Sequence, residues 1–222
     1  MPVHNERATI EEIIAKVRQV PLSKELIIVD DCSTDGTRSL LRKYEKEKEV
    51  TLIFHSRNRG KGRAIRTGLE KTSGEVVVVQ DADLEYDPQD LQELIKPIQE
   101  GKARVVYGSR RLNSTNTQHS GLSYYIGGIL VTYLARWLYR LKITDEATCY
   151  KMLETRLIKS LNLQCERFEF CPEVTAKLAK RKIPILELPI SYYPRHKKEG
   201  KKINWRDGLE AIWTLVKYKF KY

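Results

Sequence analysis

The feature that most constrains the fold is a run of four valines followed closely by two acidic residues. Residues 75–83 read EVVVVQDAD, which places Asp81 and Asp83 just beyond the valines. A continuous run of apolar residues is typical of a strand that is buried on both faces, inside a parallel sheet covered by helices on each side. The run therefore predicts a central sheet between helices, with acidic side chains where one strand ends.

The rest of the first half repeats this pattern. Apolar runs at residues 24–31, 50–56 and 103–110 predict further strands. Residues 9–20 have helical spacing of apolar side chains, and helices are expected to begin near residues 34–37, 60–62 and 87–88. The alternation predicts an α/β fold with a Rossmann-like, mostly parallel sheet and helices on both faces.

Polar clusters follow three of the predicted strands. They are Asp30-Asp31, Asp81-Ala82-Asp83 and the segment 108–111, which contains Arg110. Ligands of open α/β sheets bind beyond the carboxyl ends of the strands. The three clusters are therefore expected to lie together and to form the active site.

Asp81 and Asp83 are candidate metal ligands. Side chains two residues apart on a strand point the same way, and paired carboxylates suit Mg²⁺ or Mn²⁺ carrying a diphosphate. Solvated strand-end acids are the alternative, which is the interpretation we prefer for Glu85. Asp30 and Asp31 suit a ribose hydroxyl or a base N–H of a nucleoside, and the alternatives for them are helix capping or solvation. The full phosphate-loop motif is absent, so we expect residues 60–62 to form a flexible turn near the nucleotide, with Lys61 as a candidate phosphate contact.

The second half of the chain has a different character. Residues 123–141 are apolar and aromatic, with Arg136 and Arg140 near the end. They predict either an amphipathic helix on a membrane surface or an ordinary helix packed on the sheet. Residues 183–194 predict another strand, and residues 205–222 predict a terminal amphipathic helix.

Composition predicts one soluble domain over residues 1–222. The hydrophobic content is 41%, no run of 18 apolar residues occurs, and the four cysteines form no Cys-x-x-Cys pair. We therefore expect a cytosolic protein with reduced thiols.

The net charge of +11 favours nucleic acid, an anionic membrane or phosphorylated substrates as partners. The basic stretch at 195–202 and the basic, aromatic residues 217–222 suit a membrane surface or a nucleic-acid backbone. The alternative is that these charges form a solvated lysine surface with no partner.

Several motifs together resemble family 2 glycosyltransferases, in particular the dolichol-phosphate mannose synthase-like, polyprenyl-phosphate branch. The motifs are Pro2 to Glu6, Ile28 to Thr37, Asn58 to Gly62, Gly74 to Asp83, Gly108 to Arg110, Thr144 to Lys151, Arg167 to Glu173 and Ser191 to Arg195 with Lys202. They span nearly the whole chain.

The resemblance implies a GT-A fold, a nucleoside-diphosphate sugar of the GDP-mannose or UDP-glucose type, and Mg²⁺ or Mn²⁺. Residues 1–111 would form the nucleotide-sugar half and residues 112–222 the acceptor half. The implied substrate-binding residues are Pro2, His4, Glu6, Val29, Asp31, Lys61, Asp81, Ala82, Asp83, Arg110, Arg195 and Lys202. Asp83, Arg110 and Glu173 are the implied catalytic residues, and Asp81 and Asp83 the implied metal ligands.

Two departures from the family pattern concern the ends of the chain. Family members begin with an apolar strand before Pro2, so the first strand is expected to be truncated here. The branch also often carries transmembrane helices after the catalytic part. Without them, attachment is expected to be peripheral, at the cytoplasmic face of an anionic membrane.

The expected reaction is inverting transfer of a hexose to a polyprenyl phosphate. A phosphate acceptor is largely a dianion at neutral pH and needs little help from a general base, whereas a hydroxyl acceptor needs one. Glu173 or Asp145 could be that base. The alternatives are transfer to a soluble sugar, polysaccharide or protein, a nucleotidyltransferase, a nucleic-acid-binding module, and an inactive scaffold.

Overall fold

A computed structural model describes residues 1–117, 121–195, 202 and 204–221 of the chain. Its strands are β1 (Pro2–Val3), β2 (Leu26–Asp30), β3 (Val50–Phe54), β4 (Val76–Val78), β5 (Val105–Ser109), β6 (Lys151–Glu154) and β7 (Leu186–Pro189). Its α-helices are α1 (Ile10–Gln19), α2 (Thr37–Leu41), α3 (Lys61–Lys71), α4 (Leu91–Gln99), α5 (Leu122–Tyr139), α6 (Thr155–Ser160), α7 (Phe170–Lys180) and α8 (Trp205–Phe220). The short 3-10 helices are η1 (Arg42–Tyr44) and η2 (Pro88–Asp90).

The first sheet is parallel and is covered on both faces, as the sequence predicts. Its order is β1–β2–β3, with β2 buried along its whole length. Leu26 and Ile28 of β2 pack with α1 and α2, whereas Ile27 and Val29 pack with Ala64 of α3. Successive residues of a strand point to opposite faces. The continuous apolar run of β2 therefore fills two helix–sheet contacts at once.

The first strand is short, as expected. Only Pro2 and Val3 form β1, which pairs in parallel with β2. The amino group of Met1 adds a hydrogen bond to the Ile27 carbonyl at 2.7 Å, and Val3 is buried in the cluster beneath α1. These contacts fix where residues 4–6 leave the sheet.

The second sheet contains a strand that the sequence analysis does not predict. Its order is β4–β6–β5–β7, and β6 runs antiparallel to both of its neighbours, whereas β5 and β7 are parallel. Strand β6 begins opposite the carboxyl ends of β4 and β5, where Met152 pairs with Val78 and Lys151 pairs with Tyr107. The residues just before β6 therefore lie at the same edge as the residues just after β4 and β5.

Several element boundaries differ from the predictions. The predicted strand 75–83 ends at Val78, so the chain leaves the sheet before Asp81. The predicted strand 183–194 is reduced to four residues. The predicted terminal helix extends to Phe220, and Tyr222 lies outside the described residues.

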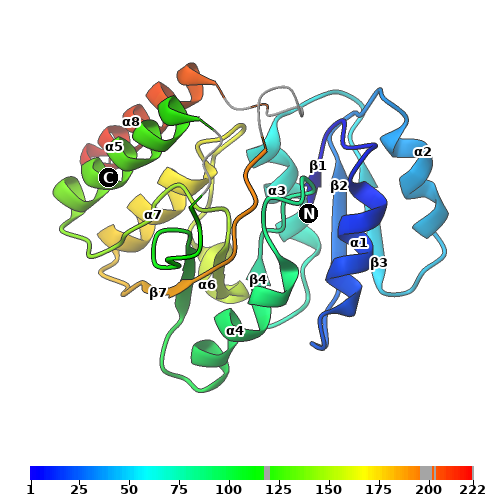
Figure 1. Ribbon diagram of the computed structural model, residues 1–222, viewed down its shortest axis with the longest axis horizontal. Coiled ribbons are helices and arrows are strands. Elements are labelled where there is room, and N and C mark those ends of the chain that lie inside the picture. The colour runs from blue at the N-terminus through cyan, green and yellow to red at the C-terminus, as the bar shows by residue number, and fades with distance from the viewer. Residues whose placement is uncertain (118–120, 196–201, 203, 222) are drawn as a thin grey trace.

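Helices α5, α7 and α8 form a separate layer at one end of the molecule (Figure 1). The hydroxyl of Tyr139 on α5 donates to the carbonyl of Leu215 on α8 at 2.6 Å, and Val131, Ala176 and Leu215 share one buried cluster. Helix α5 thus packs on other helices rather than directly on a sheet. Among the described residues, no helix combines the length and apolar character needed to cross a membrane.

Candidate active site

A cavity of about 1350 Å³ lies at the carboxyl ends of β1, β2, β4 and β5. The three polar clusters that follow the strands contribute to its wall, as the sequence predicts. Among the residues singled out from the sequence, the lining contains Pro2, His4, Glu6, Asp31, Lys61, Asp81, Ala82, Asp83, Arg110, Arg195 and Lys202. Side chains from positions 2 to 202 are thereby brought to one site.

Asp31, directly after β2, fixes the turn that precedes α3. Its buried carboxylate accepts hydrogen bonds from the amides of Arg59 and Gly60 and pairs with His55 Nδ1 at 2.7 Å. Gly60 has a φ of +88°, and a Cβ at this position would lie 2.3 Å from the Glu166 carbonyl oxygen. Only glycine both adopts this positive φ easily and leaves room for the Glu166 carbonyl. The turn at residues 59–60 is therefore tightly held, whereas the sequence led us to expect a flexible turn.

The amino end of α3 is already occupied by protein atoms. Gly62 N donates to the Arg167 carbonyl at 2.8 Å, and Arg63 N donates to the Glu166 carbonyl at 3.0 Å. These first-turn amides would otherwise be available to an anion. At this helix end, a contact with phosphate therefore depends on the side chain of Lys61.

Asp81 and Lys61 form an ion pair in the wall of the cavity. Lys61 Nζ lies 2.7 Å from Asp81 Oδ1 and 2.8 Å from Oδ2, and it is 3.6 Å from Cys149 Sγ. Burial opposes ionisation of Asp81, but the Lys61 ammonium outweighs it and holds the pKa of this carboxyl below its usual value. Asp81 is therefore a carboxylate over the physiological pH range.

Asp83 is surrounded by more negative charge than Asp81 is. Burial raises the pKa of Asp83 to about 7, and the charges of Asp81 and Glu85 add to the effect while Arg195 opposes it. Arg195 Nη2 lies 3.2 Å from Asp83 Oδ2. The elevated pKa means that a further positive charge beside Asp83 would be stabilised.

A divalent cation fits this pair of acids. The described residues contain no cluster of three or more acidic, histidine or cysteine side chains placed to hold a metal ion. Mg²⁺, however, is commonly held by one or two carboxylates and completes its shell with water and substrate phosphates. Asp81 and Asp83 supply two such carboxylates, and their mutual repulsion would fall when the ion binds.

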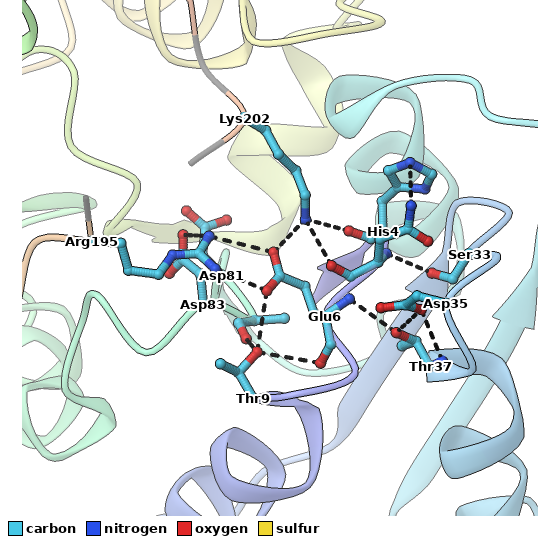
Figure 2. Close-up of polar contacts among 12 residues, drawn as sticks. His4, Glu6, Thr9, Ser33, Asp35, Thr37, Asp81, Asp83, Arg195 and Lys202 are labelled. Atoms are coloured by element: carbon cyan, nitrogen blue, oxygen red, sulfur yellow. Dashed lines mark hydrogen bonds and ion pairs between the residues drawn. The ribbon is translucent and has the colours of Figure 1, made fainter. Parts of the chain in front are cut away.

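Glu6 connects the amino-terminal loop to two basic residues near the carboxyl end of the chain (Figure 2). Its carboxylate pairs with Arg195 Nη1 at 3.1 Å and with Lys202 Nζ at 2.5 Å. Thr9 donates to the Ala82 carbonyl at 2.7 Å, which ties the same loop to the acidic motif. Residues 196–201 of the predicted basic loop lie outside the described residues.

Arg110 is anchored by a buried acid. Its guanidinium forms two hydrogen bonds with Asp145, at 2.6 and 2.7 Å, and Asp145 also accepts from the Arg110 amide. Burial opposes ionisation of Asp145, but Arg110 outweighs it and holds the pKa of Asp145 below its usual value. The Cζ atom of Arg110 lies 5.1 Å from the centre of the Tyr192 ring, over its face. Asp145 and Tyr192 together fix the position of Arg110 in the cavity wall.

Two of the residues expected at the site lie elsewhere. Val29 points into the β2–α3 contact and is not part of the cavity lining. Glu173 is fully buried in α7 and also lies outside the lining. Its carboxylate accepts from the Cys165 amide at 2.7 Å, the Tyr218 hydroxyl at 2.7 Å and Lys177 at 2.6 Å. These bonds give Glu173 a structural function, which is to join α7 to α8 and to the loop before α7.

The other end of the cavity is formed by α5 and α8. Tyr125, Gly128 and Leu130 line it from α5, and Trp205 and Leu209 line it from α8. The same helices expose large apolar side chains both at the cavity and away from it, namely Leu122, Tyr125, Ile126, Leu130, Tyr133 and Trp137 on α5 and Trp205, Leu209, Trp213 and Phe220 on α8. Elsewhere in the described chain, only Leu112, Leu186 and Tyr193 are large, apolar and exposed.

Sequence reasoning missed several residues of the cavity wall. Glu146, Cys149, Phe168 and Cys171 all line it. Glu146 and Cys149 belong to a segment whose position depends on the unpredicted strand β6. Phe168 and Cys171 depend on how α7 packs. Neither the pairing of β6 nor the packing of α7 can be predicted from the local spacing of apolar residues. The one sequence feature that pointed to these residues was the polar, motif-like character of residues 144–151.

A family model described as glycosyl transferase family 2 matches residues 1–161. It covers more than half of the chain and includes every strand from β1 to β6.

Known proteins resemble the chain over nearly its whole length. It is 26% identical to the UDP-N-acetylglucosamine–dolichyl-phosphate N-acetylglucosaminyltransferase of Methanococcus voltae, covering 99% of this chain and 94% of the relative. It is 26% identical to the dolichol-phosphate mannosyltransferase of Pyrococcus furiosus, covering 99% of this chain and 63% of the relative. The crystal structure of glucosyl-3-phosphoglycerate synthase from Mycobacterium tuberculosis with Mn²⁺, UDP and phosphoglyceric acid has the same fold, with a TM-score of 0.76 at 20% identity and coverage of 99% and 76%.

Proposed function

The chain belongs to glycosyl transferase family 2, and from this premise we propose that it transfers a hexose from a nucleoside-diphosphate sugar to a polyprenyl phosphate with inversion. Both curated relatives described above are named for transfer to dolichyl phosphate. The second is considerably longer than this chain, which spans 63% of it. The proposal therefore concerns the reaction of the part that they share.

One observation supports this reaction above the alternatives: the acidic motif and an apolar helix pair line the same cavity. Asp81 and Asp83 occupy one end, and residues of α5 and α8 occupy the other. A polyprenyl phosphate has the matching division, with a charged head beside a long hydrocarbon chain. A soluble sugar or protein acceptor would gain little from the exposed aromatic side chains of these helices.

We assign the metal and diphosphate to Asp81 and Asp83. A divalent ion held there would neutralise the charge that develops on the departing diphosphate. Thr9 holds the Ala82 carbonyl, and Arg195 and Glu6 hold the surrounding loops, so the two carboxylates are oriented before substrate binds. Preorganised groups need little rearrangement during the reaction.

The cationic side chains of the site would contact the phosphates. Lys61, Arg110 and Arg195 come from three different elements and all line the cavity. Arg110 is held rigidly by Asp145, and its remaining donors suit phosphate oxygens. Arg195 and Lys202 now pair with Glu6 and could transfer to an incoming phosphate.

The two acids that the sequence offered as general bases, Asp145 and Glu173, are both held by other side chains, which favours a phosphate acceptor. Asp145 is engaged by Arg110, and Glu173 is engaged by Lys177 and Tyr218. A phosphate monoester with a second pKa of about 6 is already largely ionised at neutral pH and needs no proton removed. We therefore do not retain Glu173 as a catalytic residue.

We also propose that the outer faces of α5 and α8 bind the surface of an anionic membrane. Tyr133, Trp137, Trp213 and Phe220 are exposed on adjoining helices. Basic residues accompany them on the same helices, and the chain carries a net charge of +11. Aromatic side chains beside lysine and arginine are favourable at the boundary between headgroups and acyl chains.

A calorimetric donor screen followed by a product assay tests the function. GDP, UDP and their sugars are titrated with Mg²⁺ or Mn²⁺ into the wild type and an Asp81→Ala, Asp83→Ala variant. The donor that binds is then incubated with a polyprenyl phosphate, and labelled sugar is measured in the organic phase. We expect metal-dependent binding of one nucleotide class and lipid-soluble product that is retained on mild alkaline treatment.

Other outcomes would identify the alternatives. Labelled product that stays in water would indicate a soluble sugar, polysaccharide or protein acceptor. Release of pyrophosphate would indicate a nucleotidyltransferase. A failure of every nucleotide to bind would contradict the transferase proposal and favour an inactive scaffold. Flotation with anionic vesicles at low salt tests the membrane contact separately, and protein that remains in the bottom fraction would contradict it.

A further inference from the structure

Glu146 is a buried acid, 1% exposed, whose polar neighbours are the Lys151 ammonium and the Thr175 hydroxyl. Burial raises the pKa of its carboxyl, and both neighbours oppose that rise. Neither side-chain oxygen forms a hydrogen bond of good geometry with a described residue. Other buried acids of the described chain, such as Asp31, Asp145 and Glu173, hold several partners each. Leaving a buried polar group unsatisfied costs stability. A site that retains such a group usually has another use for it.

The backbone of Glu146 is held firmly although its side chain is not. Its amide donates to Thr132 Oγ1 of α5 at 3.1 Å, and its carbonyl accepts from Lys151 Nζ at 2.5 Å. The Thr175 hydroxyl of α7, which is buried nearby, pairs with the Tyr107 hydroxyl at 3.0 Å. Helix α5 and strand β6 therefore hold the backbone of Glu146, Thr175 lies beside its carboxyl, and the two carboxyl oxygens can still accept a further hydrogen bond.

Glu146 lines the cavity and is linked to the acidic motif by a short series of contacts. Lys151, which bonds the Glu146 carbonyl, also donates to the Thr148 carbonyl at 3.0 Å. Cys171 Sγ donates to that same carbonyl, and Cys149 lies against Lys61, the partner of Asp81. Both cysteines line the same cavity as Glu146. Glu146 and Asp81 thus line the same cavity and are connected through residues 148–149 and Lys61.

We propose that Glu146 accepts a hydrogen bond from a hydroxyl or amide N–H group of the transferred sugar and so contributes to donor selection. The inference rests on the proposed transferase function. The sugar of a nucleotide donor is bonded directly to the diphosphate, so the wall next to Asp81 is the wall that the sugar meets. A carboxylate offers two acceptor oxygens to neighbouring donors. A hydroxyl or N–H group of the sugar would provide the well-aligned hydrogen bond that neither oxygen forms within the described chain.

A purely structural explanation makes a different prediction. Glu146 could serve only as the counter-charge of Lys151, which is fully buried. In that case substitution would lower stability without distinguishing a nucleotide from a nucleotide sugar. The contribution of the sugar to binding is therefore the quantity to measure.

The test compares Glu146→Ala with wild type by calorimetry in the presence of Mn²⁺. The titrants are UDP and GDP, the corresponding UDP-glucose, UDP-N-acetylglucosamine and GDP-mannose, and deoxy analogues of the sugar that binds. We expect nucleotide affinity to stay within about twofold, and affinity for the nucleotide sugar to fall about tenfold, which is typical of one lost hydrogen bond. Removing the contacted hydroxyl from the sugar should cost the variant nothing further.

Glu154→Ala is the matched control, because Glu154 pairs with the exposed Arg104 and lies outside the cavity lining. Glu146→Gln replaces the alanine variant if that does not fold, and its amide geometry should alter the preference among the deoxy sugars. Equal losses for nucleotide and nucleotide sugar, or no loss for either, would overturn the inference. If wild type binds no nucleotide at all, the proposed function fails and this inference fails with it.

Discussion

The two ends of the cavity are built in opposite ways. At the sheet end, charged side chains such as Asp31, Lys61 and Arg110 are each held by partners on other elements. At the helix end, the lining residues Leu130, Trp205 and Leu209 are largely exposed to solvent. One end is satisfied within the protein, whereas the other presents surface that only another apolar partner would cover.

This difference teaches that the two halves of the site follow different rules of assembly. The sheet end is specified locally, because each polar cluster follows a strand and the strands end at a common edge. The helix end is specified by contacts between distant segments, since α5 and α8 meet through Tyr139 and Leu215. Substitutions should therefore separate the two ends, and the following predictions are ordered by the size of the expected effect.

The largest effect should come from the ion pair at the sheet end. Asp145→Ala leaves Arg110 buried without its partner, so we expect the free energy of unfolding to fall by about 3 kcal/mol. The pKa of Asp145 is lowered in the folded state, so its contribution persists above about pH 4 and declines on further acidification. Denaturant unfolding at pH 7 and pH 3 measures both effects. A smaller loss at pH 7 than at pH 3 would contradict this assignment.

Removing Asp81 and Asp83 should abolish nucleotide binding at the sheet end of the cavity and leave membrane binding at the helix end unchanged. For Asp81→Ala, Asp83→Ala we expect nucleotide binding to weaken about 100-fold or more, because a divalent ion held by these acids would contribute several kcal/mol. Flotation with anionic vesicles should be unchanged. Calorimetry and flotation on one preparation make the comparison. Parallel loss of vesicle binding would mean that the two ends are not independent.

The reverse experiment addresses the helix end. Trp137→Ser combined with Trp213→Ser removes two exposed indoles, and we expect vesicle binding to weaken by about 2 kcal/mol, or roughly 30-fold. Nucleotide affinity should stay within about twofold. Leu186→Ser is the control, since Leu186 is exposed but lies on β7. An equal decrease for the control would contradict a specific membrane face.

The smallest effect tests how tightly the sheet end is packed. We expect Gly60→Ala to lower the free energy of unfolding by about 2 kcal/mol, because it adds a close contact with Glu166 to an unfavourable positive φ. Gly101→Ala has a positive φ of 70° with nothing within 4 Å, so about 1 kcal/mol is expected there. Thermal unfolding of the two variants measures the difference, which is the cost of the contact with Glu166. Equal losses in the free energy of unfolding would mean that the turn shifts to relieve that contact.

The sequence allowed much of the sheet end to be predicted. The apolar run of β2 indicated burial on both faces, and the polar residues after each strand indicated the cavity wall. Val29 was misplaced, because a resemblance identifies a position but not the direction of its side chain. The partners of Asp31 and Arg110 were also not foreseeable, since they lie 24 to 35 residues away in the chain.

The helix end was less accessible to prediction. The pattern of residues 123–141 fitted both a membrane-surface helix and a packed helix, and α5 combines the two by packing on α8 while exposing Trp137. Strand β6 was missed because only four residues pair, and with it the position of Glu146. Glu173 was expected in the site, but its partners on α8 and before α7 become neighbours only in the folded chain.

The pairing of cations with carboxylates around the cavity has a consequence for how ligands arrive. Lys61 already neutralises Asp81, and Arg195 is shared between Glu6 and Asp83. Entry of a metal–diphosphate complex would then be an exchange of ionic partners, in which metal replaces ammonium or guanidinium and phosphate replaces carboxylate. Because the number of paired charges hardly changes in such an exchange, ionic strength should affect nucleotide binding weakly. Attraction of the basic helix layer to an anionic surface, by contrast, would be strongly screened by salt.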